Sequence, residues 1–491
     1  MQIESLETKA RDVLRSILSL RNTLQPVNRL PPEILSRIAR HVLVRRNRDA
    51  RPIFPLTHVC RYWRESIVSA PENWTLISDS CSEDLVALSL ERAKAAPLVI
   101  SLSMSWVMRL HRLPGIIVPH FQNVVSFTVD SIPTPGEFTK VFPSFPRSLS
   151  NLHSLTLHAK DIKGWDLSID PFEPLPHNLR YLSLIKIHPH PLFLRLRTLT
   201  ELSLTIPRFS LHLDTLLDFL EANASLESVE LLIKFVEPSL RNSQRRAAIG
   251  NRLQRLYIHS WDLMDARAII ANIPLRKGAC LDIHLGSARL KEILSGIPTT
   301  HLLNLPSPTF IEYQSSTGGA PGCIQLKGPN GIFSFSGPRL QAEPFMDLID
   351  CPLISLANVR EFYMTTADHV MRPLSHLPAI ETLIIQSYID ISRAISALLS
   401  DPASSPSLKT IAFLNCDLSD DFMEELTQFA SNRKNTSTSA PLHRVVIVDW
   451  EGRFPSAGSI HRLRGCVRIV DVRMGDREFP MGSDIKKYLA D

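Results

Sequence analysis

Residues 199–204 read Leu-Thr-Glu-Leu-Ser-Leu, and this apolar-x-x-apolar-x-apolar pattern decides the fold. The same spacing returns along the chain, mostly at intervals of 20 to 28 residues, in segments that begin at Val124, Leu152, Leu179, Leu199, Leu226, Leu253, Val359, Ile380, Leu408 and Leu442. A short strand of this kind cannot bury its apolar face alone, so successive units must stack on one another. The sequence predicts an α/β chain with a parallel sheet built from repeated units.

The period and the leucine spacing resemble leucine-rich repeats, in which a short strand alternates with a return segment. The asparagine that often follows the third apolar position occurs only sometimes, as Asn415 after Phe413, so the array is irregular. We expect return helices at residues 213–222, 264–273 and 391–399. The resemblance implies a leucine-rich-repeat solenoid.

Residues 286–344 interrupt the pattern. Within them, residues 323–327 face residues 332–336 across Pro329-Asn330-Gly331, and Asn-Gly between alternating apolar residues is a strong hairpin signal. The segment fits a hairpin-bearing repeat or insertion, and two alternatives stay open: an element that grips a substrate and a junction between domains.

The first 25 residues predict an amphipathic helix that ends before Pro26. Its apolar residues follow one another at steps of three and four and form a single stripe: Ile3, Leu6, Ala10, Val13, Ile17, Leu20 and Leu24. Three heptads are close to the lower limit for a coiled coil. The helix either packs on its own chain or forms a short dimer zipper.

Residues 30–76 predict two or three short helices. Two prolines and Glu33 stand at the entrance of the first helix, where a missing N–H costs least and an acidic side chain meets the positive end of the helix dipole. A second apolar-periodic run ends at Pro71. The apolar faces exceed what so small a unit can bury, which indicates a protein partner.

The composition excludes several broad classes of protein. The chain has 491 residues, of which 44% are hydrophobic and 21% charged, so it is neither fibrous nor disordered throughout. Its 54 basic and 49 acidic residues give a formal net charge of +5, too even a balance for a nucleic-acid partner. No membrane-spanning stretch and no secretion signal is evident, and we expect no membrane partner. The seven scattered cysteines argue against disulfides and zinc.

The sequence lacks the motifs of the familiar enzyme classes. The sequence has no phosphate-binding loop, dinucleotide fingerprint, HExxH or GxSxG, so we expect no enzymatic activity, no cofactor and no metal. One local basic cluster comprises Arg37, Arg40, Arg45, Arg46, Arg48 and Arg51. A solvated face, an acidic protein partner and nucleic acid are all open for this cluster.

Residues 30–74 read LPPEILSRIARHVLVRRNRDARPIFPLTHVCRYWRESIVSAPENW and resemble an F-box. The matching positions are Leu30, Pro31, Glu33, Ile34, Leu35, Val59, Cys60, Arg61, Trp63 and Trp74. Ala39 stands where the family often has an aromatic residue, and an arginine-rich stretch replaces the usual apolar middle helix. The preceding helix and the irregular repeats together resemble the F-box proteins of mushroom-forming fungi.

The resemblance implies a substrate-recognition adaptor of a cullin-RING (SCF-type) ubiquitin ligase, located in the cytoplasm or nucleus. Its partners would be a Skp-family linker with its cullin complex, and a protein substrate. The residues expected to bind the linker by family position are Leu30, Pro31, Ile34, Leu35, Ile38, Val59, Cys60 and Trp63. The alternative is a non-catalytic repeat scaffold whose F-box-like helices act outside ubiquitin transfer.

Strand parity assigns the substrate-binding side of the repeats. In each repeat the last two apolar residues, at positions four and six, point inward, so positions three, five and seven face the open side of the sheet. The candidates on that side are Tyr181, Glu201, Glu230, Arg255, Tyr257, His259, Glu361 and Tyr363. The predicted organisation is a helix at 1–25, an F-box at 28–76, repeats at 77–473 with the insertion at 286–344, and a polar tail at 474–491.

Overall fold

The computed structural model describes residues 2–45, 53–104, 113–134, 149–160, 165–166, 177–188, 196–206, 213–233, 252–260, 262–273, 275–276, 278–286, 290–294, 308–314, 322–329, 331–337, 348, 354–365, 376–386, 405–437, 439–449 and 452–474. These residues fall into two compact units, 1–208 and 209–491. The predicted return helix at 391–399, most of the polar tail, and the arginines at positions 46, 48 and 51 lie outside the described residues.

The first unit begins with helices. They are α1 (Gln2–Thr23), η1 (Pro26–Arg29), α2 (Pro32–Arg45), α3 (Ile53–Thr57), α4 (Arg61–Ser69) and η2 (Pro71–Trp74). Proline stands at the first turn of η1, α2 and η2, where the missing N–H has no helical partner to lose. The core of the module contains Leu35, Ala39, Trp63, Ile67 and Trp74. We call α2 to η2 the helical module.

The apolar stripe of α1 lies on the surface of the first unit. Six members, Ile3, Leu6, Val13, Ile17, Leu20 and Leu24, are 57% to 75% exposed. The expectation that this helix buries its stripe on its own chain is therefore wrong for the described residues. The reason is geometric, because α1 meets the unit at its C-terminal end, where Asn28 donates to the carbonyl of Asn22 over 2.6 Å.

A parallel sheet follows in the first unit. Its strands pair in chain order: β1 (Leu76–Ser78), β2 (Leu98–Ser103), β3 (Val124–Ile132), β4 (Ser154–Ala159), β6 (Tyr181–Ile185) and β8 (Glu201–Ile206). A buried row crosses it through Ile100, Phe127, Leu155, Leu182 and Leu202. A two-stranded sheet pairs β5 (Trp165–Asp166) with β7 (Ile187–His188).

Helical segments occupy the returns of the first unit where these are described. They are α5 (Glu83–Ala93), α7 (Leu113–Ile117) and η3 (Val118–Asn123). Ser82 caps α5 by accepting the amide of Leu85. Arg92 of α5 stacks over the Trp74 ring at 4.4 Å from its centroid, which joins the helical module to the first return helix.

The second unit carries a longer sheet that is parallel except at one strand. Its ladder runs β9 (Ser228–Ile233), β10 (Arg255–Ser260), β11 (Cys280–Leu285), β14 (Gly331–Gly337), β13 (Gly322–Gly328), β12 (Phe310–Gln314), β15 (Glu361–Thr365), β16 (Thr382–Gln386), β17 (Thr410–Leu414), β18 (Arg444–Asp449) and β19 (Ile469–Met474). The predicted α/β class with stacked strands is confirmed. The register supplies the physical reason, because each inward apolar residue stands beside another in the next strand.

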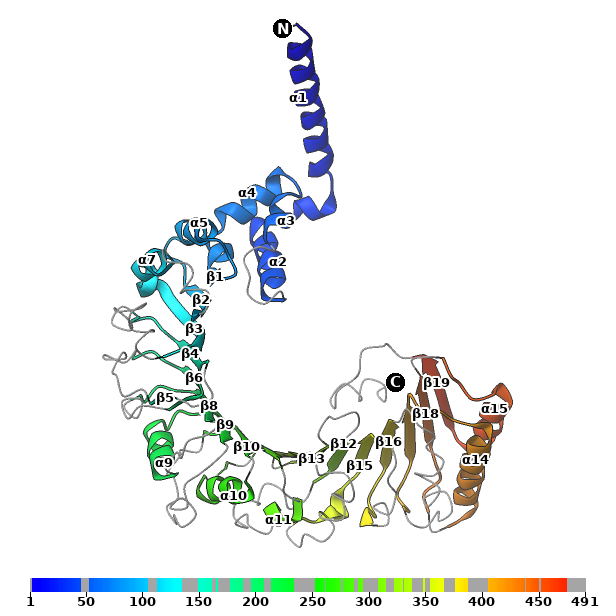
Figure 1. Cartoon of the computed structure of the whole chain (residues 1–491). Helices are drawn as coiled ribbons and strands as arrows, with labels where there is room; N and C mark the ends of the chain where they lie inside the picture. The colour runs from blue at the N-terminus through cyan, green and yellow to red at the C-terminus, as the bar shows by residue number, and fades with distance from the viewer. Residues whose placement is uncertain are drawn as a thin grey trace. The chain divides into compact units, whose positions relative to one another are not determined.

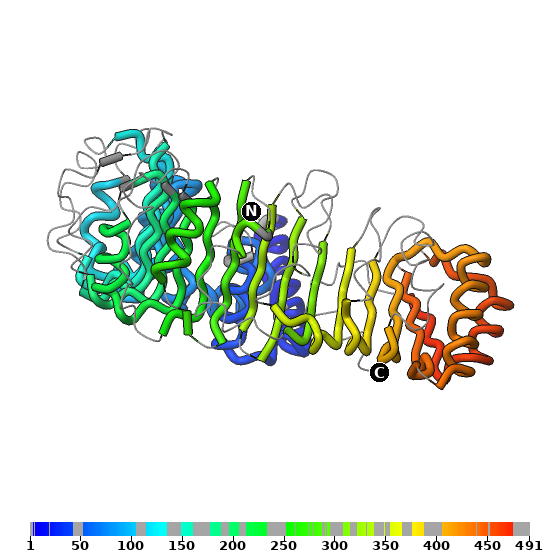
Figure 2. Tube along the Cα trace, turned by 90° about the horizontal axis from the view of Figure 1, so that it is seen from below, coloured from blue at the N-terminus to red at the C-terminus, as the bar shows by residue number. Residues whose placement is uncertain are grey.

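Within the described residues, the return helices of the second unit are α9 (Leu213–Ala222), α10 (Leu263–Asn272), α11 (Leu290–Leu294), η7 (Leu356–Asn358), α14 (Asp420–Asn435) and α15 (Ala457–Cys466). The return helices expected at 213–222 and 264–273 are confirmed as α9 and α10. Side chains of Asp262, Ser419 and Ser456 cap α10, α14 and α15. Both views place α14 and α15 side by side at the end of the unit formed by β18 and β19 (Figures 1 and 2).

The predicted hairpin is present, and it belongs to a three-stranded meander. Residues 323–327 pair antiparallel with residues 332–336 as expected, and β12 adds a third strand on the other side of β13. The outer strands of the meander run parallel to their neighbours, β14 to β11 and β12 to β15. The segment at 286–344 therefore supplies three strands to the sheet.

Arg433 anchors the last long helix. Its guanidinium is buried and donates to the carbonyls of Ser405, Pro406, Leu408 and Ala440, at distances of 2.9 to 3.2 Å. Burial lowers the pKa of this group. The bonds hold α14 to the loops that enter β17 and β18, where backbone carbonyls would otherwise lack partners. Within the part of the chain that the structure describes, no helix is both long and apolar enough to span a bilayer.

Candidate functional site

The first candidate surface lies at the entrance of the helical module, and Asn28 fixes its shape. The Asn28 side-chain oxygen accepts from the Trp63 indole N–H at 2.7 Å and from the Cys60 thiol at 3.7 Å. The Tyr62 hydroxyl donates to the carbonyl of Leu30 at 2.7 Å. These bonds tie the segment before α2 to the start of α4. The side chains around Leu30 and Val59 therefore sit on a rigid base.

The structure separates the predicted linker-binding residues into surface and core. Pro31 is exposed, Val59 is 53% exposed and Ile34 is 37% exposed, while Leu30, Ile38 and Cys60 are half-buried. Leu35 and Trp63 were also expected to bind the linker, but in this structure they are core residues of the helical module and offer no surface to a partner. Leu35 is fully buried and Trp63 is 7% exposed, because both side chains fill the space between α2 and α4.

A second set of contacts fixes the far end of the module. The Ser36 hydroxyl lies 3.0 Å from both Glu72 and the Asn73 side-chain oxygen, and Asn73 donates to the carbonyl of Ile67. The Trp74 indole also donates to the carbonyl of Ile67. Because these buried polar groups are satisfied, the module keeps one arrangement of its helices.

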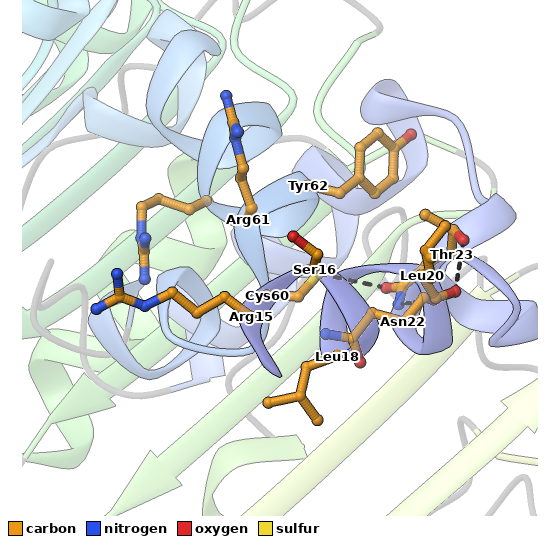
Figure 3. A pocket seen from close by; sticks show the side chains of 11 residues that line it. Arg15, Ser16, Leu18, Leu20, Asn22, Thr23, Cys60, Arg61 and Tyr62 are labelled. Atoms are coloured by element: carbon orange, nitrogen blue, oxygen red, sulfur yellow. Dashed lines mark hydrogen bonds between the residues drawn. The ribbon is translucent and has the colours of Figure 1, made fainter. Parts of the chain in front are cut away.

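An open hollow lies between the second half of α1 and the start of α4. Its volume is about 910 Å³, and its lining combines the basic side chains of Arg15, Arg61 and Arg64 with Leu18 and Tyr62. Among the lining side chains, Figure 3 labels Arg15, Leu18, Arg61 and Tyr62, which come from the two helices. Arg61 is paired with Glu65 at 2.6 Å, and this contact raises the pKa of Arg61. The hollow is therefore a partly neutralised basic surface next to the module.

The open face of the first unit is rich in hydroxyl groups. One row crosses the strands through Ser78, Ser101, Thr128, Thr156, Ser183 and Ser203. The predicted residues Tyr181 and Glu201 stand side by side in the neighbouring row. Beyond the hydroxyl row, His158 forms an ion pair or hydrogen bond with Asp130. The face carries polar groups at regular strand spacing, although Ser78 and Ser183 of the hydroxyl row are buried.

The second unit gathers titratable side chains over β9, β10, β11 and β14. Glu230, Tyr257 and Asp282 share one row, and His259, His284 and Ser336 share the next. The rings of His259 and His284 meet edge to face with centroids 4.2 Å apart. His284 Nδ1 lies 2.7 Å from the Ser336 hydroxyl. We call Tyr257, His259, Asp282, His284 and Ser336 the polar cluster.

Burial changes the acid–base behaviour of the polar cluster. It lowers the pKa of His259 and His284, and the neighbouring His284 lowers that of His259 further. Burial raises the pKa of Asp282, and burial together with Asp282 and Glu230 raises that of Tyr257. The pKa of the Cys323 thiol is raised to about 12. Both imidazoles therefore favour the neutral form, which can donate and accept one hydrogen bond each.

Of the other predicted substrate-binding residues, Arg255 and Glu230 are exposed near the polar cluster, and Glu361 lies farther along the ladder on β15. Tyr363 was expected to be an exposed anchor, and it is 2% exposed. Its hydroxyl donates to Gln386, and its ring belongs to a buried apolar group with Phe310, Ile384, Ala412, Leu414, Val446 and Val448. Strand parity placed Tyr363 on the correct face of the sheet, but it could not show that this part of the face is covered.

Sequence reasoning missed Asp282, His284 and Asn28. Residues 280–285 read Cys-Leu-Asp-Ile-His-Leu, and this alternation predicts a strand with Asp282 and His284 on one face. The leucine pattern failed there because Gly278, with φ of +88°, stands where the first apolar residue would be. Among the described residues, no three His, Cys, Asp or Glu side chains gather as metal ligands would.

Neither the known protein families nor the curated proteins include a match to this chain. Among solved structures it is similar to the leucine-rich repeat-containing protein LegL7 from Legionella pneumophila, with 13% identity, a TM-score of 0.29, and coverage of 74% of this chain and 96% of that one. It is also similar to TLR13 in its complex with ssRNA13, with 13% identity, a TM-score of 0.33, and coverage of 80% and 47% respectively.

These likenesses are too distant to carry an argument about function. What defines the class of this protein is its own geometry: strands stacked in register, return segments between them, and a buried apolar row along one face. It is an α/β repeat scaffold with polar side chains on the open face of its sheets.

Proposed function

We propose that the chain is a substrate-recognition adaptor of an SCF-type ubiquitin ligase, with no catalytic activity of its own. In this proposal the helical module binds a Skp-family linker, which joins it to the cullin complex, and the repeat face binds a protein substrate. The observation that carries the proposal is the apolar entrance of the module. Pro31, Ile34 and Val59 remain exposed there although the module has a complete core of its own.

The entrance of the helical module loses little conformational entropy when a partner binds. Asn28 and Tyr62 hold the backbone around Leu30 and Val59 before any partner arrives. Burying an aliphatic side chain of this size yields about 1.5–3 kcal/mol before the cost of association is subtracted. Several such side chains on a rigid base supply enough free energy for a stable complex.

The polar cluster supports a protein substrate for the repeat face. Tyrosine and arginine are preferred anchors in protein interfaces, and Tyr257 and Arg255 stand on the same strand and the same face. Exposed Glu230 beside them gives the surface both signs of charge. Such a mixed surface fits a polypeptide better than a polyanion, whose binding needs an excess of basic groups.

The test is co-purification of a Skp-family linker and cullin with the full-length chain. We expect Leu30→Ala combined with Pro31→Ala to remove both proteins from the purified complex, while thermal unfolding of the chain is nearly unchanged. The matched control is Tyr257→Ala with Arg255→Ala, which should keep the linker and lose the substrate instead. Linker binding that survives the Leu30 and Pro31 changes would refute this placement.

A further outcome would favour the alternative function. If the wild-type chain recovers no linker and instead carries a stoichiometric partner through the same entrance, the module serves an assembly outside ubiquitin transfer. In that case the partner should still be lost with Leu30→Ala and Pro31→Ala.

A further inference from the structure

The uncovered stripe of α1 is the largest run of exposed apolar side chains among the described residues. Its six large members are 57% to 75% exposed along the whole helix. A monomeric soluble protein rarely leaves a continuous apolar stripe of this length in water. We propose that α1 pairs with α1 of a second copy of this chain in an antiparallel two-helix coiled coil.

The spacing of the stripe matches a coiled coil throughout α1. Its residues follow one another at steps of three and four from Ile3 to Leu24, so they occupy alternate a and d positions of three heptads without a break. Steps that average 3.5 residues keep the stripe against a supercoiled partner of the same length. A second copy of α1 meets this requirement for the stripe residues from Leu6 to Leu24.

The small residue in the stripe favours the antiparallel direction. In an antiparallel pair in which facing residue numbers add to about 30, Ala10 faces Leu20 of the second copy, Val13 faces Ile17 and Leu6 faces Leu24. Each small side chain then meets a large one. In a parallel pair Ala10 would face Ala10 and leave a void between the helices, which costs packing energy.

The charges beside the stripe favour the same direction. Antiparallel helices bring the e positions of both copies together, and here these positions hold Glu7, Leu14 and Arg21. Glu7 then faces Arg21 of the second copy at both ends of the pair, and Leu14 faces Leu14 at its centre. In a parallel pair Arg21 would face Ser16. Glu7 lies 3.9 Å from Arg11 in its own helix and remains 63% exposed, so it can also accept from Arg21.

The first measurement is the mass of the full-length chain by sedimentation equilibrium over a range of concentrations. We expect a dimer for the wild type, and a monomer for Val13→Glu combined with Ile17→Glu. Leu18→Glu is the matched control, since Leu18 is an exposed leucine of the same helix outside the stripe and should leave the dimer intact. A wild-type chain that stays monomeric at every concentration overturns the proposal, as does a dimer that survives the stripe variant.

A charge exchange tests the direction. Glu7→Arg alone puts like charges opposite each other at both ends, and should weaken the dimer by roughly tenfold. Adding Arg21→Glu to the same chain should restore the affinity, because the two pairs are then opposite in sign again. A dimer whose affinity is unchanged by both substitutions is parallel, and this result overturns the antiparallel assignment. The outcome does not depend on the linker, because Leu30 and Pro31 are untouched.

Discussion

Asn28 is a single polar side chain that organises the whole entrance of the helical module. Its oxygen accepts from Trp63 and Cys60, and its nitrogen donates to the carbonyl of Asn22 at the end of α1. One carboxamide therefore joins three segments. The apolar surface beside it keeps its shape only while these bonds persist, because Trp63 would otherwise hold a buried N–H without a partner.

Replacement of Asn28 separates these contributions. Asn28→Ala removes the acceptor of the Trp63 indole and should lower the free energy of unfolding by about 1–3 kcal/mol. Asn28→Asp keeps an acceptor oxygen and loses only the donation to Asn22, so its effect should be smaller. Urea denaturation of the two variants measures the difference. Equal destabilisation by both would show that the bond to Trp63 contributes little.

The two histidines of the polar cluster give the protein a pH dependence of known sign. Their folded-state pKa values are lowered by burial, whereas an unfolded histidine titrates near 6.5. As the pH falls from 7 through about 6.5, the unfolded chain binds more protons and stability is lost. Asp282 acts in the opposite direction at lower pH, because its folded-state pKa is raised.

The measurement is thermal unfolding between pH 7.5 and pH 5.5. His259→Gln combined with His284→Gln should flatten the decline in melting temperature relative to the wild type. A matched change at exposed His461, whose ring lies on α15 away from the cluster, should leave the decline as it is. An unchanged slope in the double variant would contradict the burial of these imidazoles.

At the scale of elements, the meander depends on glycines where β14 approaches β11. Gly331 has φ of +144°, and a Cβ there would collide with the carbonyl of Ala279. A Cβ at Gly337 would also be too close to the backbone, since it would lie 2.7 Å from the carbonyl oxygen of Leu285. Gly331 is therefore required for both backbone conformation and close approach, and Gly337 for close approach alone.

Gly331→Ala should destabilise the second unit by about 1–3 kcal/mol, because the strained conformation and the collision both oppose the folded state. Gly465→Ala is the control of opposite sign. Gly465 lies in α15 with nothing within 4 Å of a new Cβ, and should gain about 0.5–1 kcal/mol. Chemical denaturation of both variants tests the pair, and a neutral Gly331→Ala would contradict the close approach.

The sequence predicted elements best where one local signal determined them. The leucine pattern located β3, β4, β6, β8, β9, β10 and β15 to β18, and Asn330-Gly331 located the β13–β14 hairpin. The sequence did not predict β12 as a partner of β13, because the pairing of strands that are distant in sequence does not alter local residue spacing. It also missed β11, where glycine interrupts the pattern.

At the scale of the whole molecule, the sequence supplied candidate binding residues but did not show which of them stay exposed. Leu35, Trp63 and Tyr363 fit their patterns as well as Pro31 and Val59 do, yet they are buried. Periodicity assigns a side chain to a face, while exposure depends on what other parts of the chain lie over that face. For α1, periodicity assigned the apolar residues to one stripe but did not show that the stripe stays exposed.

The meander also has a consequence for how the array can change its length. Each inward position of β11 continues in phase through β14, β13 and β12 into β15, as the row Leu281, Phe333, Leu326, Ile311 and Phe362 shows. The reversed strand β13 is enclosed between β12 and β14, which run with the ladder. Removal of β12, β13 and β14 would leave β11 and β15 as neighbouring edges. These two strands run in the same direction and have their inward residues in the same register. We therefore expect a chain that lacks the three strands to pair β11 directly with β15 in the same register.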